Sequence, residues 1–310
     1  MFGIDRQVYY RKIRLRFNKQ NKARLVVDMV LEIRQQMPRI GSKKLYYLLH
    51  QDLKTLKIGR DKFIDILRAN HLLITPKRSY HITTNPHHRF RKYTNQIIEL
   101  EINKPEQVWV SDITYIGKRD KPCYLSLITD AYSKKIVGYN VSDNLNTESS
   151  LAALRLAIKQ RKNKDLILIH HSDRGLQYCA NEYQKVLSKN RIKPSMTQNS
   201  DPYENAVAER INGILKQEFN IDKYNKDLPI MKQIIKETVE IYNEKRPHYS
   251  NHMLTPNQMH QQNTLKIKTY KSKKHLQKRF CKCLINYFCL INLYRFFRTS
   301  HIVIACVTNI

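Results

Sequence analysis

The spacing of apolar residues divides the chain into two regions. Between residues 21 and 70, apolar side chains recur three and four positions apart, a spacing that predicts amphipathic helices. We expect three of them: residues 21–37, a second helix that Ser42 caps, and a third that follows Gly59. Two short helices after a longer one, joined by tight turns, are typical of a helix-turn-helix unit. The amino-terminal region is therefore predicted to be all-α.

Short runs of β-branched and aromatic residues begin at residue 108. The run VWVSDITYI, at residues 108–116, predicts a strand. The pattern then predicts strands at 124–129 and 135–141 joined as a hairpin, a helix at 147–161, a strand at 166–169, and a further helix around Glu209. This alternation of strands and helices predicts an α/β domain.

Three carboxylates stand in or beside these elements. Asp112 lies in the middle of the first strand, where burying a charge is costly unless a cation or hydrogen bonds compensate it. Asp173 follows the fourth strand, and functional groups gather at that edge of an open α/β sheet. Glu209 projects from a helix that follows the turn at Asp201-Pro202. Three converging carboxylates are suited to holding two divalent cations about 3.5–4 Å apart for phosphodiester chemistry.

The intervals between these residues do not decide between a catalytic and a structural role. The chain has 26 Asp and Glu residues, so some pair at any chosen interval is expected by chance. Asp112 also suits a hydrogen-bonded strand residue, Asp173 a helix cap, and Glu209 a solvated helix face. The residues that flank the three carboxylates carry more information.

Those flanking residues resemble the integrase-core transposases of bacterial insertion sequences. The match is to the product of the second reading frame in the insertion sequence three family. Three motifs, W-x-x-D-I-T-Y, H-S-D-x-G-x-Q-Y and N-A-x-x-E-x-x-x-x-x-L-K, stand here at residues 109–115, 171–178 and 205–216, and a fourth, Y-N-x-x-R-P-H, stands at 242–248. Four ordered motifs are a far more specific signal than one short pattern.

The resemblance implies a DDE-type polynucleotidyl transferase with a ribonuclease H-like integrase catalytic core. In such a core Asp112, Asp173 and Glu209 are the catalytic residues, and they bind two ions of Mg²⁺ or Mn²⁺. Other motif residues are expected to support the site: Trp109, His171, Asn205, Tyr242, Arg246 and His248. The resemblance covers roughly residues 1 to 270 and departs at Glu204, where the family usually has Asp.

Charge agrees with a partner that is a polyanion. The 56 Lys and Arg residues against 26 Asp and Glu give a net charge of +30, and residues 1–92 alone carry +16. Charge by itself does not separate DNA from RNA or an anionic membrane surface, and an AT-rich coding sequence also raises the lysine content. If the amino-terminal region is a helix-turn-helix, Arg60, Lys62 and Arg68 of its third helix face phosphates or base edges. The alternative is a packing module whose cations are only solvated.

Two further features near the carboxylates have open roles. Lys216 lies seven residues after Glu209, two helical turns along and on the same face. Its family counterpart contacts transposon-end DNA, whereas a solvated lysine is the alternative. His170 and His171 either orient a carboxylate or serve the structure.

The cysteines exclude one related class of protein. None of the six precedes residue 123, so the chain lacks the His-His-Cys-Cys zinc module expected ahead of a retroviral integrase core. Cys281, Cys283 and Cys289 lack the usual spacing of a zinc site. The amino terminus is basic and has no apolar signal segment. We therefore expect a cytoplasmic bacterial protein, associated with the nucleoid when bound to DNA and not with a membrane.

The chain is predicted to comprise four segments. They are a helical helix-turn-helix-like DNA-binding domain at 1–74, a basic linker at 75–95, the integrase catalytic core at 96–260, and a basic, disordered or non-native tail at 261–310. The tail has no acidic residue beyond Lys271, and its apolar run is too short and too interrupted for a membrane helix.

Two functions from different classes fit the sequence. The first is an insertion-sequence transposase that performs metal-dependent strand cleavage and strand transfer at element ends, and so DNA integration and recombination. Its partners are double-stranded DNA, namely the terminal inverted repeats and the target, with further copies of the chain on that DNA. The second is a catalytically inactive DNA-binding derivative or regulator of transposition. Since the family often makes its active form by frameshift fusion, an upstream-frame protein is a further expected partner.

Overall fold

The computed structural model describes residues 5–75, 93–97, 100–117, 122–198, 205–224 and 226–262. The chain divides into one compact unit at residues 1–264 and a second at 265–310, and the second lies outside the described residues. Most of the linker expected at 75–95, and all of the expected tail beyond residue 262, also lie outside them.

The elements follow the predicted order. The first region is helical, with α1 (Arg6–Gln36), α2 (Ser42–Leu48), α3 (His50–Thr55) and α4 (Arg60–Ala69). The second alternates strands and helices: β1 (Val108–Ile116), β2 (Cys123–Asp130), β3 (Ile136–Ser142), α5 (Thr147–Gln160), β4 (Leu168–Ser172), α6 (Leu176–Cys179), α7 (Asn181–Lys189), β5 (Ile192–Met196) and α8 (Ala206–Glu218). It continues with η2 (Ile221–Lys223), α9 (Leu228–Glu244), η3 (Tyr249–Asn251) and α10 (Pro256–His260).

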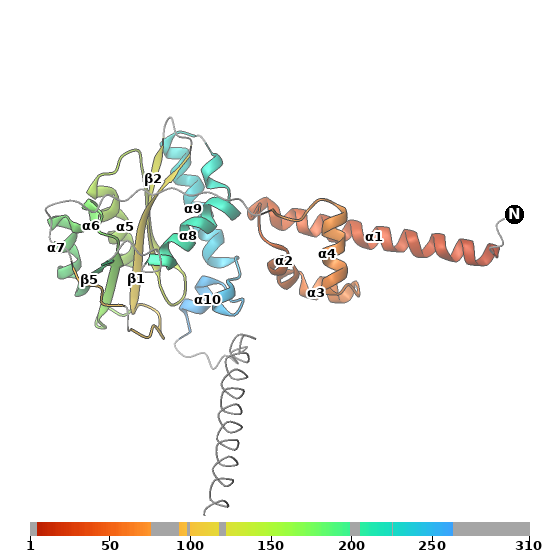
Figure 1. Cartoon of the computed structure of the whole chain (residues 1–310), viewed down its shortest axis with the longest axis horizontal. Helices are drawn as coiled ribbons and strands as arrows, with labels where there is room; N and C mark the ends of the chain where they lie inside the picture. Colours follow the sequence, from red (N-terminus) through yellow and green to blue (C-terminus); the bar gives the residue numbers. More distant parts are fainter. Residues whose placement is uncertain are drawn as a thin grey trace, which may run out of the picture. The chain divides into compact units, whose positions relative to one another are not determined.

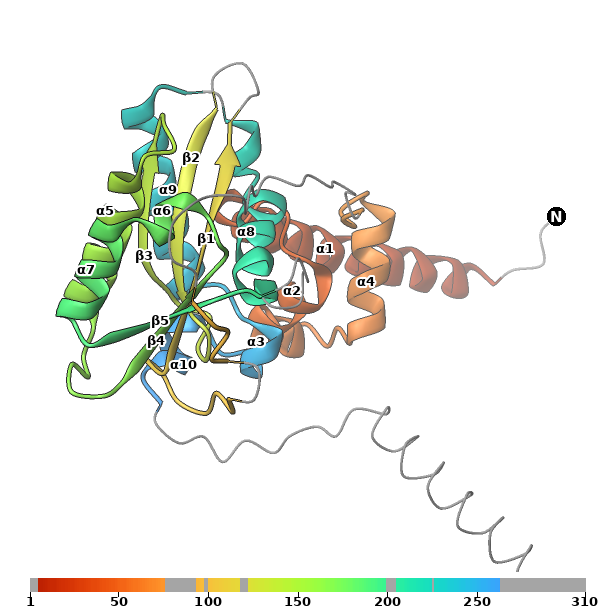
Figure 2. The ribbon, with the colours of Figure 1, turned by 60° about the vertical axis from the view of Figure 1, so that its left-hand side comes forward.

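A five-stranded sheet organises the second region, with the strand order β3-β2-β1-β4-β5 (Figures 1 and 2). β2 pairs antiparallel with β1 and with β3, whereas β4 pairs parallel with β1 and with β5. The hairpin predicted from residues 124–141 is thus confirmed. Three antiparallel strands followed by two shorter parallel ones form the sheet expected of a ribonuclease H-like fold. This order makes β1 the central strand.

Helices cover both faces of the sheet (Figures 1 and 2). α5 packs on β2 and β3 and α7 on β5, whereas α8 packs on β1 and β2 and α9 on β3. Successive residues of a strand point to opposite faces. Accordingly, Val137 belongs to the apolar cluster that includes Leu154 of α5, while the adjacent Ile136 belongs to the cluster that includes Leu215 of α8. The sheet is therefore the middle of three layers.

The first helix is longer than predicted. α1 begins at Arg6 and not at residue 21, but only its second half is packed, where Val26 and Val30 are buried with Phe63 and Leu67 of α4. Apolar periodicity reports the packed face of a helix, so it misses the earlier turns, whose Arg, Lys and Gln residues favour helix without a buried stripe. No helix in the described part of the chain, α1 included, is long and apolar enough to cross a membrane.

The prediction that Ser42 caps the second helix is wrong. Ser42 is the first residue of α2, and Gly41 stands at the cap position without a side-chain hydrogen bond. The second helix also ends early, because the backbone at Leu49 leaves helical geometry and α3 begins at His50. The third predicted helix is α4, which follows Gly59 as expected.

Glu218, the last residue of α8, joins the helical region to the α/β region. Its carboxylate accepts hydrogen bonds from Arg246 Nε and Nη2 at 2.9 and 2.8 Å and from Lys44 Nζ at 2.8 Å. Its backbone carbonyl accepts from the Arg39 N–H at 2.9 Å. Burial alone would raise the pKa of Glu218, but the hydrogen bonds and charges of Arg246 and Lys44 outweigh burial and lower that pKa.

Candidate active site

Asp112 lies in the middle of the central strand β1, as the sequence predicts. Its side chain is partly buried, and two N–H groups donate to its carboxylate. Asn212 Nδ2 lies 2.8 Å from Oδ2, and the backbone nitrogen of Ile113 lies 2.9 Å from Oδ1. Both oxygens of the carboxylate are thus held in a defined orientation.

The surroundings of Asp112 oppose its ionisation. Burial, followed by the negative charge of Asp173, raises the pKa of Asp112 to about 7. The hydrogen bonds from Asn212 and Ile113 act in the opposite direction, and the charge of Glu209 adds a smaller increase. Both other predicted carboxylates therefore act electrostatically on Asp112.

Asp173 follows directly on β4, whose last residue is Ser172. β4 runs parallel to β1 and pairs His171 with Val110, so continuing this register by two residues places Asp173 beside Asp112. Asp173 Oδ1 accepts a hydrogen bond from the Gly175 N–H at 3.1 Å. The predicted position just beyond a strand end is confirmed.

Glu209 stands in the first turn of α8, and its side chain is exposed. Partial burial raises its pKa. α8 begins after Asn205, whose Nδ2 donates to the backbone carbonyl of Ser111 at 3.1 Å. Because Ser111 precedes Asp112, this hydrogen bond fixes the start of α8 against the strand that carries the aspartate.

Asn212 and Lys216 extend the site along α8. They lie three and seven residues after Glu209, and residues at these spacings share one helix face. Burial lowers the pKa of the half-buried Lys216, while the charge of Asp112 acts to raise it. Sequence reasoning placed Lys216 on this face but missed Asn212. The available signal was the three-residue spacing from Glu209 inside the same motif.

The paired histidines lie inside a strand and not beyond its end. β4 begins at Leu168, two residues later than predicted, because Leu166 and Ile167 are exposed. This shift carries His170 and His171 into the strand, where both are buried.

Hydrogen bonds to hydroxyl groups hold both histidines. His170 Nε2 lies 3.0 Å from Ser111 Oγ and 3.0 Å from the Tyr183 hydroxyl, and His171 Nδ1 lies 2.9 Å from Ser195 Oγ. Burial lowers the pKa of His170 to about 3, so its ring is neutral at physiological pH. These contacts brace β4 against its neighbours, and they favour the structural role for the two histidines.

The remaining motif residues support the scaffold. Trp109 is fully buried in the cluster under α5 and α7. The Tyr242 hydroxyl donates to the backbone carbonyl of Lys134 at 2.8 Å, and Arg246 binds Glu218 as described above. His248 Nδ1 lies 3.1 Å from Ser250 Oγ, and burial lowers the pKa of His248 to about 3. The Y-N-x-x-R-P-H motif thus holds α8 and α9 in place.

The three cations predicted to bind DNA in the helical region are exposed on α4. Arg60 forms an ion pair with Asp61 and Arg68 with Asp65, both on the surface, where such pairs contribute little. Exposure is compatible with DNA contact through Arg60, Lys62 and Arg68, which stays a prediction.

Asp112 and Asp173 have the chemistry of a magnesium or manganese site, since carboxylate oxygens are the ligands these ions prefer. Within the ranges that the structure describes, no group of three or more His, Cys, Asp and Glu side chains is arranged to hold a metal ion. Glu209 is exposed, and its charge raises the pKa of Asp112 less than that of Asp173 does. Closure of all three carboxylates around ions stays a prediction.

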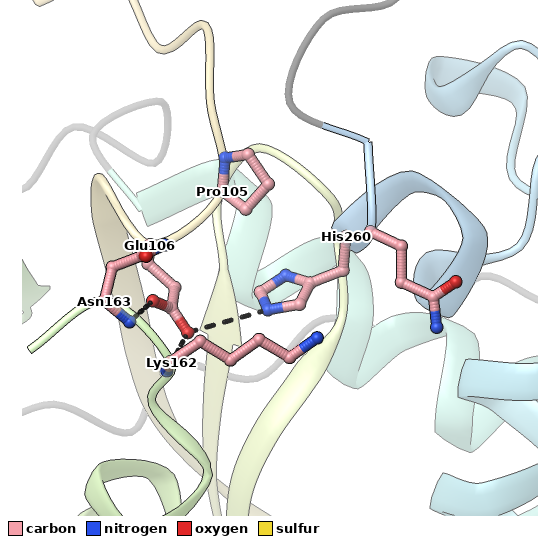
Figure 3. Close-up of a pocket in the computed structure, with 6 residues that line it drawn as sticks. Pro105, Glu106, Lys162, Asn163 and His260 are labelled. Atoms are coloured by element: carbon pink, nitrogen blue, oxygen red, sulfur yellow. Dashed lines mark hydrogen bonds and ion pairs between the residues drawn. The ribbon is translucent and has the colours of Figure 1, made fainter.

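A separate pocket, of about 180 Å³, lies at the edge of the sheet where β1 begins (Figure 3). Glu106 accepts hydrogen bonds there from the backbone N–H groups of Lys162 and Asn163 at 2.8 and 2.7 Å. His260 Nε2 approaches Glu106 Oε1 at 3.9 Å. The acceptors are occupied by contacts that fasten the chain before β1 to the end of α5 and to α10. We therefore assign this pocket to the scaffold.

Comparison with known families and proteins shows the family to which the chain belongs. Sequence models of the integrase core domain match residues 102–202 and, for a second model of that description, residues 190–256. The first range contains Asp112 and Asp173, and the second contains Glu209. The insertion element IS600 uncharacterized 31 kDa protein of Shigella sonnei is 31% identical over 255 residues, which cover 80% of this chain and 92% of that protein. This chain belongs to the integrase-core transposases of the insertion sequence three family.

Two further comparisons are shorter. The transposase InsF for insertion sequence IS3fB of Escherichia coli is 31% identical over 160 residues, which cover 51% of this chain and 55% of that protein. The HTLV-2 integrase catalytic core in complex with magnesium matches with a TM-score of 0.40 and 20% identity, covering 51% of this chain and 97% of that one. The fold of this transposase rests on its own strand order and helix placement.

Proposed function

We propose that this transposase catalyses metal-dependent DNA strand cleavage and strand transfer at the ends of an insertion sequence, with Asp112, Asp173 and Glu209 as the catalytic carboxylates. The observation that carries the proposal is the aspartate pair. Two carboxylates stand where a central strand and its parallel neighbour meet, and their repulsion helps to raise the pKa of Asp112 to about 7. Two carboxylates that repel each other in a buried position destabilise the fold. A divalent cation bound between them would offset both the repulsion and the cost of burying their charge.

The first proposed step hydrolyses a phosphodiester bond, and the second exchanges one phosphodiester bond for another. In cleavage, a water oxygen bonds to the phosphorus at the element end, and the 3′ oxygen leaves as a hydroxyl. In strand transfer, that hydroxyl oxygen bonds to a target phosphorus and loses its proton, and the 3′ oxygen of the target leaves. Neither step needs a covalent protein intermediate or an external energy source.

The residues of this chain have separate roles in the proposal. Asp112 and Asp173 bind the cations. Glu209, in the first turn of α8, becomes the third carboxylate ligand when its side chain rotates toward the two aspartates. Bound Mg²⁺ or Mn²⁺, two ions in our proposal, supplies a Lewis acid for the attacking and leaving oxygens. Lys216 contacts a DNA phosphate beside the aspartates, two helical turns from Glu209.

Double-stranded DNA is the proposed substrate, as element ends and as target. Because transfer requires two ends to be handled together, we propose that several copies of the chain act on one DNA assembly. We also propose that an upstream-frame protein contributes, either fused to this chain or added to it, as the sequence resemblance implies.

The test uses the full-length protein with a labelled duplex of the element end and MgCl₂ or MnCl₂. Asp112→Asn, Asp173→Asn and Glu209→Gln should each abolish cleavage and transfer and leave end binding in a gel shift unchanged. Asp165→Asn, which removes an exposed carboxylate outside the site, is the matched control and should cleave normally. Cleavage that persists in any one of the three variants would refute the role of that residue.

A second candidate is a DNA-binding regulator of transposition without catalytic activity. The exposed position of Glu209 outside a closed metal group favours it. The same assay separates the two functions. A wild-type protein that binds the end and cleaves with neither metal, even with the upstream-frame protein present, is the regulator.

A further inference from the structure

The amino-terminal half of α1 packs against no other element among the described residues. Every residue from Tyr9 to Lys22 is exposed, whereas Val26 and Val30 in the second half are buried. Figures 1 and 2 show these turns extending beyond α2, α3 and α4, with no other helix of the described residues beside them. We call residues 6–24 the basic arm. Its described tether to the rest of the helical region is the hydrogen bond from Lys22 Nζ to the Leu56 carbonyl at 3.0 Å.

The composition of the basic arm is one-sided. It contains eight cationic residues and no acidic residue, and the next carboxylate along the chain is Asp28. Among the described residues, no carboxylate forms an ion pair with any of these eight cations. Lys12 and Arg16 lie four residues apart, so like charges stand one turn from each other and destabilise the isolated helix. A solvated surface helix normally alternates its charges, and this one does not.

Most of the cations of the arm lie outside its one short apolar stripe. At 100° per residue, Tyr10, Ile13 and Phe17 line up in one stripe about two turns long. Six of the eight cations, at positions 11, 12, 14, 16, 19 and 22, spread over the rest of the circumference, and the other two, Arg6 and Arg24, fall in line with the stripe near the two ends of the arm. A broad cationic surface on a rigid rod is the feature that a partner must match.

Duplex DNA matches this surface better than the other candidates. The basic arm is about 28 Å long, and a duplex presents one phosphate charge per about 1.7 Å of its axis. A second copy of the arm would double the positive charge without supplying one carboxylate. A membrane surface would gain only the short stripe of Tyr10, Ile13 and Phe17, one of which carries a polar hydroxyl.

We propose that the basic arm is a DNA-binding element that contacts the phosphate backbone of a duplex, separate from α4 and from the catalytic face of α8. The inference rests on the proposed function, because it takes DNA as the substrate. Contacts to phosphates carry no sequence information, so the arm adds affinity for any duplex and steers the helical region onto it.

The experiment compares two triple variants of the full chain. Arg11→Gln/Arg14→Gln/Arg16→Gln removes three charges from the arm and keeps good helix formers there. Lys159→Gln/Lys185→Gln/Lys189→Gln removes three exposed charges from α5 and α7 and is the matched control. The probe is a labelled 30-base-pair duplex of arbitrary sequence, and its affinity is measured by fluorescence anisotropy from about 50 to 200 mM salt.

The arm variant should bind about tenfold more weakly or worse at the lower salt, and its slope of log affinity against log salt should flatten by about 2.7. The control variant should keep both values close to wild type. Equal losses of affinity in the two variants would show that only the total charge of the protein matters. Unchanged affinity of the arm variant would show that the arm does not contact DNA. Either result overturns the proposal.

Two parallel measurements test the other partners of the arm. The arm variant and the wild type should have the same oligomeric state by light scattering without DNA. They should also bind phosphatidylserine vesicles equally in co-sedimentation. A change in oligomeric state or vesicle binding, with DNA binding unchanged, would assign the arm to a second copy or to a membrane. If the wild type binds the duplex through the arm but never cleaves an element end, the proposed function fails while this inference stands.

Discussion

At the scale of single residues, the cost of holding Asp112 ionised is the central physical fact of the site. Burial and two nearby carboxylates raise the pKa of Asp112 to about 7, and hydrogen bonds from Asn212 and Ile113 oppose the increase. Without a cation, the folded protein therefore keeps a proton on Asp112 at a pH where the unfolded chain has released it. This difference links stability to pH.

We predict that the metal-free protein loses stability as pH rises from about 4 to about 7. In this window the folded state binds one more proton than the unfolded state, so the free energy of unfolding decreases with pH, by at most a few kcal/mol. Asp112→Asn should flatten the slope, and Asp165→Asn should not. Urea unfolding at pH 5 and pH 8 measures it.

Added Mg²⁺ gives the same prediction a second readout. At pH 8 it should raise the unfolding midpoint of the wild type and leave that of Asp112→Asn nearly unchanged, since one ligand is then missing. If the free energy of unfolding depends on pH equally in the wild type and in Asp112→Asn, then the pKa of Asp112 is not raised in the folded protein.

The motifs identified the catalytic candidates but not their local partners. Asp112, Asp173 and Glu209 stand out from sequence because each lies inside a long, specific string of residues. Asn212 donates to Asp112 from 100 residues away, and only the packing of α8 on β1 brings the two together. The neutral, bracing role of His170 likewise depends on burial, which no local pattern reveals.

At the scale of elements, β3 and α5 approach each other closely at Gly138. A Cβ atom at Gly138 would lie 2.2 Å from the backbone oxygen of Ala153 and 2.9 Å from Ala157 Cβ. The glycine and the two alanines allow strand and helix to touch through their backbones. This contact positions α5 on the face of the sheet opposite α8.

We predict that Gly138→Ala destabilises the protein by about 1–3 kcal/mol or more, because the added methyl overlaps the backbone of α5. Gly213→Ala is the control, since its Cβ would meet nothing within 4 Å and alanine favours the interior of α8. The control should gain about 0.5–1 kcal/mol. Thermal or urea unfolding compares the two, and equal midpoints would show that β3 and α5 are free to separate.

Elements were predicted well where a buried face produced a clear period. The β2–β3 hairpin and α5 carry alternating or helical apolar patterns, and both were found at the expected residues. The apolar run before His170 led to a wrong prediction of where the strand begins. Leu166 and Ile167 are exposed, and the strand starts after them. Burial follows from the whole fold, so a short apolar run does not fix the limits of a strand.

At the scale of the whole molecule, one carboxylate contacts both the helical region and the catalytic core. Glu218 accepts from the buried Arg246 and from Lys44 of α2. The two cations are not equivalent. Arg246 is 1% exposed and is paired with Glu218, whereas burial, aided by Arg246, lowers the pKa of Lys44 to about 8.

We predict a large difference between Glu218→Gln and Lys44→Met. The first leaves the Arg246 charge buried and unpaired and should cost about 3 kcal/mol or more. The second removes a charge that is itself costly to bury and should change the free energy of unfolding by about 1 kcal/mol or less. Urea unfolding of both variants measures this, and a larger loss in Lys44→Met would mean that the contact with α2 dominates.

The contacts along α8 also constrain how the gene can change. Asn205 before the helix binds β1, Asn212 binds Asp112, and Glu218 at the far end binds Arg246. An insertion or deletion of one residue within α8 would turn everything after it by about 100° and shift it by about 1.5 Å. Substitutions on the outer face leave this arrangement intact, whereas a change in length does not. Relatives of this transposase are thus expected to differ on the outer face of α8 but to share its length.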